Sequence, residues 1–469
     1  MTPVEIVRER YRFPFELHNY QVTEVNYLCG FDRTGVYWEP GAGKTTGSTH
    51  QMLYDKLVRG ISHYIILMPP VLLEQWQHWL QRVVDADTGK PLVANIYAGD
   101  PKKRSKIPLN GDFTLMSYGI FKNDFEYLYE SFPDNTGLNC DEASAIKNIE
   151  SDNHRAVALW SEDSPLMLLT GTPVNKPGDA YAYIKLVAPG VYRNRRHFNR
   201  IHVKEVDEYE KVTEWMNLDL LAQNMRIQTS RVLRREVRSE LPPVIYTPIR
   251  YKLLPAHLKL YRRIAEERLV GMDDGTEIDA ISSSKLRSHL QQVVINWSAF
   301  DERAGRPAAL DLIDETMEEI AGRKLVVVAN FRRSNALLLS ETREKYGAVA
   351  IYGDVTPKGK VEALRRFVED DDCRLILLQP DSAGYGVDGL QHVCSDMLVV
   401  EAPTTPTPFT QVVARLDRDG QKEAVNCRVA MAQGTVQVRM FGDLLNKDAL
   451  ANKVQGSFKD LKEAIFGDE

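Results

Sequence analysis

The chain has 469 residues, enough for roughly two to four domains that each bury a core of their own. Hydrophobic residues make up 43% of it and charged residues 26%, which is ordinary for a globular protein and excludes disordered, collagen-like and coiled-coil chains. The formal net charge of -6 excludes a protein that coats polyanions with general positive charge, so a nucleic-acid partner would be held by local basic patches.

Short apolar runs rich in β-branched residues alternate with segments of helical period along most of the chain. In the first half these runs predict strands at residues 64–68, 113–117 and 166–169. Between the first two, apolar residues at helical spacing predict a helix over residues 71–84. Strands that alternate with helices in this way are typical of parallel sheets covered by helices.

The middle of the chain has a different character. Residues 178–238 are polar and basic with a helical pattern, and they end near Leu241-Pro242-Pro243, where proline stops any helix. Beyond this junction strands are predicted at residues 325–329, 349–352, 375–378, 397–400 and 428–431. The sequence therefore predicts an α/β fold of two successive doubly wound parallel-sheet lobes with a helical insertion between them.

A glycine-rich segment, Glu39 to Thr45, precedes a predicted helix that ends at Gly60. Gly41 and Gly43 would let successive N–H groups face a phosphate at the positive end of the helix dipole. Lys44 would then lie between the β- and γ-phosphates of ATP, with the Thr45 hydroxyl on Mg²⁺. Since Trp38 stands where the longer form of this pattern has glycine, a plain glycine turn is the alternative interpretation.

Two polar segments further along the chain complete a possible nucleotide site. We expect Asp141 to hold Mg²⁺ and Glu142 to orient and deprotonate an attacking water. An isolated acidic pair is more often a solvated turn, but the glycine segment before it favours the catalytic interpretation. The second segment, Thr170-Gly171-Thr172-Pro173, follows an apolar strand and could bridge the site to a neighbouring surface, or be a simple strand exit.

Two arginines of the second lobe stand three residues apart, which predicts that they share one helical face. Arg415 and Arg418 could neutralise charge on a γ-phosphate during its transfer, as arginine fingers do. A surface salt-bridge pair is the alternative, and Gln411, Gly420 and Gln421 at fixed offsets speak against it.

The sequence carries no sign of export or membrane insertion. Five cysteines are scattered without a C-x-x-C pair, which favours a reducing compartment. Glu5 and Glu9 interrupt the N-terminus where a secretory signal needs an apolar run, and the longest mostly apolar stretch, residues 64–73, is too short for a membrane span. We therefore expect a soluble cytoplasmic protein with no membrane partner.

Taken together, residues 17–437 resemble the superfamily 2 helicase-type ATPases, specifically the Swi/Snf branch of double-stranded DNA translocases. The segment His18-Asn19-Tyr20-Gln21 is similar to the adenine-recognition segment of that family, which puts Gln21 on the adenine edge. Residues 68–76 and 117–119 resemble motifs that contact the DNA backbone in the family, which implies DNA contacts for Pro69 and Tyr118. Residues 170–175 are similar to the family's motif L-T-G-T-P-h-x-N, in which h is an apolar residue. This resemblance implies DNA contacts for Thr170 and Thr172 as well.

The second lobe continues the resemblance through Asn330-Phe331, residues 352–356 and residues 382–387. The last segment touches both nucleotide and DNA in the family. The resemblance therefore implies nucleotide contacts for Gly384, Gly386 and Gln411. It implies DNA contacts for Phe331, Thr356 and Ser382.

The junction between the lobes is typical of this branch. Leu233-Arg234-Arg235 precedes Glu240-Leu241-Pro242-Pro243, and Arg234 and Arg235 belong to an arginine group that would face one way on a helix. The group consists of Arg231, Arg234, Arg235 and Arg238. Such a group is either a solvated face or a set of phosphate contacts that bind DNA without reading its sequence.

The chain also departs from the family pattern. Ser144 stands where the family usually has a histidine that links the nucleotide site to the Thr-Gly-Thr segment, which puts the coupling of ATP to DNA in question. Gly389 and Leu390 stand where an Asn-Leu pair is common. Since the remaining length leaves no room for a bromodomain, chromodomain or zinc module, the chain resembles compact bacterial or phage members of the family.

The resemblance implies a RecA-like ATP-binding lobe over residues 1–240, with a helical protrusion from about residue 178. A second RecA-like lobe would cover residues 241–469, with a short helical protrusion over about 256–305. The predicted activity is a DNA-stimulated ATPase that closes its lobes on ATP and steps along a duplex.

Three other functions stay open at this point. A strand-separating helicase of replication, recombination or repair shares every catalytic motif and would need a wedge hairpin that the sequence cannot identify. A metabolic P-loop kinase would not need the arginine motif of the second lobe. A DNA-binding scaffold without catalysis would not need Asp141 and Glu142.

Overall fold

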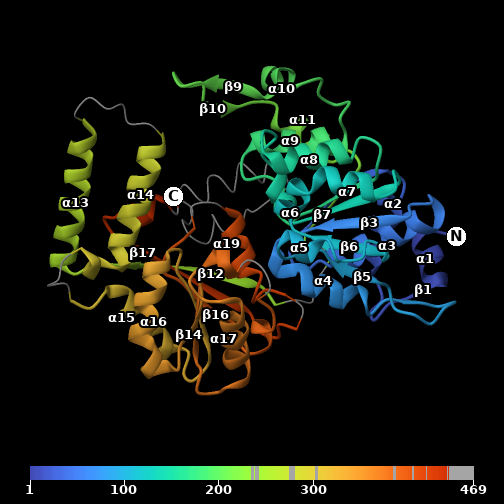
Figure 1. Ribbon diagram of the computed structural model, residues 1–469. Coiled ribbons are helices and arrows are strands. Elements are labelled where there is room, and N and C mark those ends of the chain that lie inside the picture. The colour runs from blue at the N-terminus through green and yellow to red at the C-terminus, as the bar shows by residue number, and fades with distance from the viewer. Residues whose placement is uncertain are drawn as a thin grey trace. The chain divides into compact units, whose positions relative to one another are not determined.

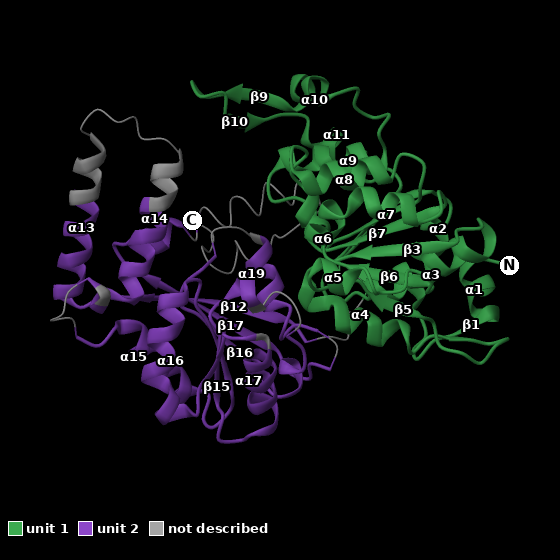
Figure 2. Cartoon of the chain, in the orientation of Figure 1, with its two compact units in different colours: residues 1–239, 450–457 green, residues 240–449, 458–469 purple. Residues whose placement is uncertain are grey.

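The structure is a computed structural model that describes residues 1–233, 237, 242–273, 280–300, 305–383, 387–403, 406–418, 420–440 and 442. These residues fall into two compact units, one within residues 1–239 and the other within residues 240–449 (Figure 2). Each unit contains one large parallel sheet with helices around it (Figure 1). The predicted pair of doubly wound lobes is therefore confirmed.

In unit 1, the described residues form a seven-stranded sheet whose neighbouring strands all run parallel. The strands are β2 (Arg33–Trp38), β3 (His63–Leu67), β5 (Ala94–Ile96), β6 (Phe113–Met116), β7 (Thr136–Asp141), β8 (Leu166–Leu169) and β11 (Thr229–Val232). Their order across the sheet is β11-β2-β8-β7-β3-β6-β5. A small antiparallel pair, β1 (Tyr11–Arg12) with β4 (Val84–Asp85), lies apart from this sheet.

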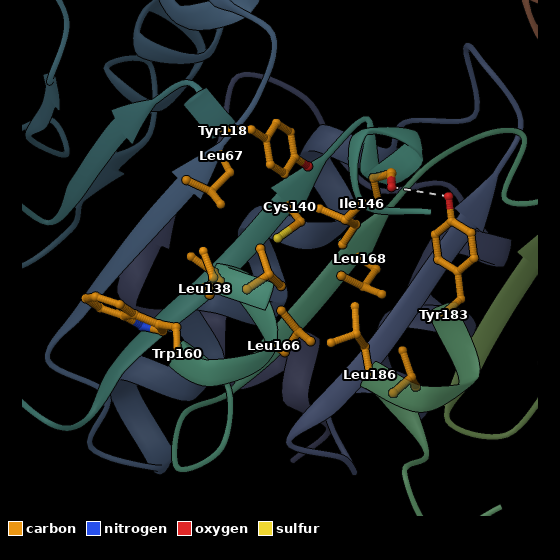
Figure 3. Packing of buried hydrophobic residues seen from close by; sticks show 14 of the residues in the cluster. Leu67, Tyr118, Leu138, Cys140, Ile146, Trp160, Leu166, Leu168, Tyr183 and Leu186 are labelled. Atoms are coloured by element: carbon orange, nitrogen blue, oxygen red, sulfur yellow. Dashed lines mark hydrogen bonds between the residues drawn. The ribbon is translucent and has the colours of Figure 1, made fainter. Parts of the chain in front are cut away.

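Both faces of this sheet are buried, because side chains that alternate along each strand enter two separate hydrophobic clusters. Leu166 and Leu168 of β8 belong to one cluster, and Met167 and Leu169 belong to the other. Figure 3 shows the first cluster, in which the sheet packs against helices of one face. A parallel strand buried on both faces is a continuous apolar run, which is why β3, β6 and β8 could be predicted from the sequence.

The helices of unit 1 connect these strands. They are α1 (Pro3–Arg10), α2 (Asn19–Leu28), α3 (Lys44–Val58), α4 (Leu73–Leu80), α5 (Pro101–Arg104), α6 (Tyr118–Asn123), α7 (Phe125–Ser131), α8 (Asp152–Trp160), α9 (Ala180–Val187), α10 (Arg195–His202) and α11 (Leu218–Met225). The predicted helix over residues 71–84 is shorter in the structure, since a 3₁₀ turn at Pro70–Leu72 precedes α4.

The region predicted as a helical insertion is only partly helical. Between α10 and α11 the chain forms an antiparallel hairpin of β9 (Val203–Val206) and β10 (Val212–Trp215), and β11 then joins the main sheet beside β2. Both hairpin strands are short and mostly exposed, so they lack the apolar run that would have identified them. The prediction of a helical insertion missed these strands for this reason.

Unit 2 has a six-stranded sheet among its described residues, again with all neighbours parallel. Its strands are β12 (Val244–Tyr251), β13 (Leu325–Val328), β14 (Val349–Ile351), β15 (Leu375–Leu378), β16 (Asp396–Val399) and β17 (Val425–Ala432). The order is β12-β17-β16-β13-β15-β14. Strand β12 was not predicted, since it is a half-exposed edge strand that contains Pro248, a residue found in sheets mainly at edges.

The helices of unit 2 are α13 (Pro255–Asp273), α14 (Ala280–Ile295), α15 (Ala308–Glu319), α16 (Arg332–Tyr346), α17 (Pro357–Glu369), α18 (Pro380–Ala383) and α19 (Pro406–Val413). Among the described residues, no helix has both the length and the apolar character that a membrane span requires. All five cysteines of the chain are buried and unpaired with one another. Burial raises the pKa of each thiol, so the thiols are held in the neutral form.

Candidate active site

The glycine segment, the Thr-Gly-Thr segment and the acidic pair follow three adjacent strands of unit 1. They leave the carboxyl ends of β2, β8 and β7, and Leu169 at the end of β8 pairs with Val36 on one side and Asp141 on the other. Ligands of doubly wound sheets bind outside the carboxyl ends of the strands. Three segments far apart in the sequence therefore meet at the edge where a ligand is expected.

Two further predicted motifs leave the same edge. Pro69 follows β3, and Tyr118 follows β6. In the sheet, β3 lies between β7 and β6. The sheet thus places every motif predicted in the first lobe up to residue 173 on one side of unit 1, apart from Gln21 on α2.

The glycine segment has the backbone that its two glycines allow. Gly41 and Gly43 have φ of 84° and 79°, in the left-handed region, and Gly43 is the residue before the first turn of α3. A Cβ at Gly43 would overlap Nε2 of Gln21. Any other residue at position 43 would therefore be strained and would displace that side chain.

Gln21 is held against the loop rather than left free. Its Nε2 donates to the Ala42 carbonyl at 3.0 Å, and its Oε1 accepts from the His18 backbone N–H at 2.8 Å. The side chain is buried. Gln21 therefore braces the glycine segment in this structure, and its predicted contact with adenine stays a prediction.

Lys44 and the acidic pair influence one another electrostatically. Lys44 Nζ donates to the Trp38 carbonyl at 2.9 Å. Burial lowers the pKa of Lys44, whereas the negative charges of Glu142 and Asp141 act to raise it. For Asp141, burial raises the pKa, and the Trp76 hydrogen bond and the Lys44 charge act to lower it. The glycine segment and the acidic pair therefore belong to one site.

Asp141 is fixed on three sides. Trp76 Nε1 donates to Oδ2 of Asp141 at 2.7 Å, the Glu142 N–H donates to Oδ1 at 2.9 Å, and the Tyr118 hydroxyl donates to the backbone carbonyl at 2.8 Å. Trp76 was not predicted as a site residue, although its place a few residues after Pro69 was a usable signal.

Tyr118, which was predicted to contact DNA, has a structural role inside unit 1. Its ring is buried in the hydrophobic cluster of Figure 3, and its hydroxyl is bonded to Asp141. In the same view, the Tyr183 hydroxyl donates to the Ala143 carbonyl at 3.2 Å. Both tyrosines therefore hold the loop that carries the acidic pair.

Glu142 adopts a backbone conformation that residues other than glycine rarely adopt. Its φ of 51° and ψ of 53° place it in the left-handed region. Strain of this kind is concentrated at functional sites. This conformation ends β7 and precedes a 3₁₀ turn at Ala143–Ile146.

The Thr-Gly-Thr segment packs directly on the glycine segment. A Cβ on Gly171 would lie 2.7 Å from Cδ of Pro40, closer than real Cβ atoms approach, so only glycine fits. Thr170 is fully buried, and its Oγ1 accepts from the Thr172 N–H at 3.2 Å. The Ser144 hydroxyl turns back to the Glu142 carbonyl at 3.5 Å.

The residues present suit a magnesium ion bound together with a phosphate. The described residues contain no group of three or more His, Cys, Asp or Glu side chains placed to hold a metal ion. Mg²⁺ is usually held by one or two carboxylates plus phosphates of the substrate, not by an all-protein cage. The Asp141 carboxylate and the hydroxyl of Thr45, on the first turn of α3, match that donor set.

In unit 2, the predicted DNA segments also follow strand ends, and Gln379 connects them. Its Nε2 donates to the Asn330 carbonyl at 3.2 Å, and its Oε1 accepts from the Gly353 N–H at 2.9 Å and from the Ser382 hydroxyl at 3.4 Å. Thr356 is exposed and caps α17 by accepting from the Gly359 N–H at 3.1 Å.

Phe331 is positioned by a buried carboxyl group. Glu401 accepts hydrogen bonds from the N–H groups of Asn330 and Phe331 at 2.9 and 3.1 Å and from the Ser334 hydroxyl at 2.6 Å. Burial raises the pKa of Glu401 to about 7, although these hydrogen bonds act to lower it. The start of α16 is thus tied to the end of β16 through a group that titrates near neutral pH.

This carboxyl group should make stability depend on pH. Because the pKa of Glu401 is about 7 when folded and near 4.5 when unfolded, the folded state binds more protons between these values, and the free energy of unfolding falls as pH rises through that range. The loss approaches ~3 kcal/mol at full ionisation. Glu401→Gln cannot ionise, so its stability relative to wild type should be greater at pH 8 than at pH 5.

Urea unfolding at the two pH values tests this expectation. Glu341→Gln, which replaces an exposed carboxylate of α16, serves as the control. Equal stability differences between Glu401→Gln and wild type at both pH values would contradict the raised pKa.

The two arginines of the second lobe do not share a helix. Helix α19 ends at Val413, so Arg415 and Arg418 lie in the turns that follow, and the predicted helical face was wrong. Both still reach one segment: Arg415 Nη1 donates to the Val387 carbonyl at 3.2 Å, and Arg418 lies 3.2 Å from Oδ1 of Asp388. Gln411 is buried in α19.

Four predicted site residues cannot be placed. Gly384, Gly386, Arg234 and Arg235 lie outside the described residues. Arg231, predicted to share a helical face with the last two, lies in strand β11, so that prediction was wrong at this position.

Two family models match the chain. The SNF2-related domain matches residues 20–299, and the helicase conserved C-terminal domain matches residues 308–420. With the two parallel-sheet lobes, these matches define the class of the protein: a helicase-type ATPase core of superfamily 2. The chain belongs to the SNF2-related family, since that domain alone covers more than half of its residues.

The chain is also similar to individual proteins. An uncharacterized ATP-dependent helicase of Mycoplasma pneumoniae is 25% identical over 470 residues, which cover 97% of this chain and 43% of that protein. The DNA repair and recombination protein RAD54-like of Gallus gallus is 21% identical over 86% of this chain and 60% of its own length. The chain thus spans less than half of the Mycoplasma protein.

Among solved structures, the SWI2/SNF2 ATPase core of Sulfolobus solfataricus in complex with dsDNA is 20% identical. The match covers 97% of this chain and 98% of that one, with a TM-score of 0.44.

Proposed function

We propose that the protein hydrolyses ATP and uses the energy to move along double-stranded DNA without reading its sequence. One observation carries the proposal: the glycine segment with Lys44 and the pair Asp141-Glu142 meet at the carboxyl edge of one parallel sheet, close enough to shift one another's pKa. Family membership supports the ATPase assignment.

The residues divide the chemistry among them. The N–H groups after Gly41 and Gly43 and the Lys44 ammonium bind the phosphates at the positive end of the α3 dipole. Thr45 and Asp141 would hold Mg²⁺, which when bound neutralises phosphate charge. Glu142, which follows Asp141 at the end of β7, accepts a proton from the attacking water. Gln21 would contact adenine.

Arg415 and Arg418 are proposed, on the sequence motif, to neutralise charge that develops during phosphate transfer, with Gln411, Gly384 and Gly386 contacting the nucleotide. DNA contacts are proposed for the loops that follow the strands of both sheets. The residues are Pro69, Tyr118, Thr170, Thr172, Phe331, Thr356 and Ser382, with Arg234 and Arg235. For the buried Tyr118 and Thr170, the backbone of the loop would make the contact.

Translocation is favoured over strand separation by the composition of the hairpin. The β9–β10 hairpin is a candidate for the wedge that a strand-separating helicase needs, but its acidic residues outnumber its lysines. The acidic residues are Glu205, Asp207, Glu208, Glu210 and Glu214, against Lys204 and Lys211. Such a hairpin would be repelled by DNA phosphates.

ATP hydrolysis measured with added duplex DNA, single-stranded DNA or RNA tests the proposal. Duplex DNA should raise turnover most, and a forked duplex should stay unseparated during hydrolysis. Stimulation by single strands alone, or separation of the fork, would favour the helicase alternative. ATP hydrolysis that no nucleic acid stimulates would contradict the proposal.

The bond between Trp76 and Asp141 gives a sharper test of the metal site. Trp76→Phe keeps the aromatic packing and removes the donor to Oδ2 of Asp141, so the apparent affinity of the ATPase for Mg²⁺ should fall by about 10- to 100-fold. The measurement is ATP turnover against Mg²⁺ concentration.

Trp79→Phe is the matched control, because Trp79 on the same helix donates its indole N–H to Thr49 at 3.0 Å instead. Its Mg²⁺ dependence should match wild type. An unchanged Mg²⁺ dependence in Trp76→Phe would remove Asp141 from the metal site.

A further inference from the structure

Arg231 lies at the carboxyl end of β11, the edge strand beside β2. Its side chain is only 16% exposed, and Arg231 pairs in register with Tyr37 of β2. An arginine on an edge strand can usually extend into solvent. Here the guanidinium turns inward to the glycine segment, so its burial calls for a role.

The guanidinium connects three parts of the candidate active site. Nη1 donates to the Tyr37 carbonyl at 2.7 Å and to the Gly171 carbonyl at 2.9 Å. Nη2 lies 3.8 Å from Oε1 of Glu39, at the start of the glycine segment. One side chain thus holds the end of β2, the glycine segment and the Thr-Gly-Thr segment.

The two segments are also in direct contact, without spare space between them. Gly171 lies so close to Pro40 that a Cβ would not fit. A shift of Gly171 must therefore move Pro40 or break the Arg231 bonds. Because the guanidinium is planar and rigid, it transmits such a shift better than a flexible ammonium would.

Ser144, which follows the acidic pair, makes a weaker hydrogen bond that stays within its own loop. The Ser144 hydroxyl is directed to the Glu142 carbonyl at 3.5 Å, within its own loop. The bonds of Arg231 to Tyr37 and Gly171 are shorter and charge-assisted, which makes them about twice as strong as neutral ones.

We propose that Arg231 is a positioning residue that couples the Thr170–Thr172 segment to the glycine segment. DNA bound at the Thr170–Thr172 segment would then change how the glycine segment binds phosphate. The inference rests on the proposed function and deepens it: it names the residue through which DNA stimulates hydrolysis. Arg231 contacts neither substrate nor DNA in this role. Its loss should therefore affect stimulation more than the fold.

The test compares Arg231→Met, Arg231→Lys and wild type in the full chain. The readouts are the ratio of duplex-stimulated to unstimulated ATP turnover, the KM for ATP, and the thermal midpoint. Loss of the charge-assisted bonds in Arg231→Met should lower the ratio about tenfold. Arg231→Lys keeps the charge and can reach one carbonyl, so it should recover part of the ratio.

Arg33 provides a matched control at the opposite end of the neighbouring strand β2. Its guanidinium also binds backbone carbonyls, those of Leu186, Ser161 and Glu162. Arg33→Met should therefore lower the thermal midpoint as much as Arg231→Met does, and leave the stimulation ratio unchanged. A purely structural role of Arg231 would make the two variants behave alike.

The outcomes separate the inference from the proposed function. If duplex DNA stimulates wild type and both Arg231 variants have the same stimulation ratio as wild type, the inference is overturned and the proposed function stands. If Arg33→Met lowers the ratio equally, the inference is likewise overturned. Should Arg231→Met fail to fold, the stimulation ratio of Arg231→Lys is compared with that of wild type. An unchanged ratio overturns the inference, and a lowered ratio supports it. A wild type that no nucleic acid stimulates would overturn the proposed function and the inference together.

Discussion

Glu142→Gln is expected to lower ATP turnover by about 10²- to 10⁴-fold, the range by which a positioned general base accelerates proton transfer. Glutamine has the same shape and can adopt the same left-handed backbone with similar strain, so the loop after β7 should keep its structure. The phosphates are bound by the glycine segment and Lys44, so ATP should still bind. Single-turnover phosphate release and binding of a fluorescent ATP analogue measure the two effects separately.

Glu150→Gln is the control for this substitution. Glu150 is exposed and lies beyond the 3₁₀ turn at Ala143–Ile146, just before α8, so turnover of this variant should equal that of wild type. If Glu142→Gln hydrolyses ATP at the wild-type rate, the general base is another residue. If it loses ATP binding as well, Glu142 has a structural role in the site.

Lys44→Ala is expected to lose both binding and hydrolysis. Lys44 is the first residue of α3, and its ammonium is bonded to the Trp38 carbonyl and close to the negative charges of the acidic pair. Charge-assisted hydrogen bonds of about 1.5–3 kcal/mol correspond to an affinity loss of about 10- to 100-fold. Turnover should fall further, because the charge that develops on the γ-phosphate would lose its neighbouring cation.

Lys56→Ala tests whether the effect belongs to position 44. Lys56 lies on the same helix, and its Nζ donates to the Ser62 carbonyl at 2.7 Å, away from the glycine segment. Its ATP binding and turnover should stay at wild-type values. Hydrolysis by Lys44→Ala as fast as by wild type would mean that the nucleotide site is elsewhere.

Strands β3, β8, β13 and β15 were predicted to within one residue of their ends, because they are buried on both faces. Leu166–Leu169 and Leu375–Leu378 are unbroken apolar runs of this kind. Strand β12 and the hairpin β9–β10 could not be predicted, because an exposed strand has no apolar run. Strand β12 also pairs with β17, a partner far along the chain.

The candidate site also contains residues that could be identified from the sequence and residues that could not. Gly43, Lys44 and Asp141 could be identified from local motifs, because phosphate and metal binding need particular residue types at particular spacings. The residues that hold those motifs in place were missed, since each acts through a contact distant in sequence. Trp76 reaches Asp141 over 65 positions, and Arg231 reaches Gly171 over 60.

The burial of all five cysteines makes the protein suited to fluorescent labelling. Thiols that are buried and neutral react slowly with maleimide dyes, so the native cysteines can stay in place. Ser131 at the end of α7 and Ser340 in α16 are exposed, one in each unit, and cysteines there would accept a donor and an acceptor dye. Energy transfer between the dyes would then report how the distance between the units changes during ATP turnover.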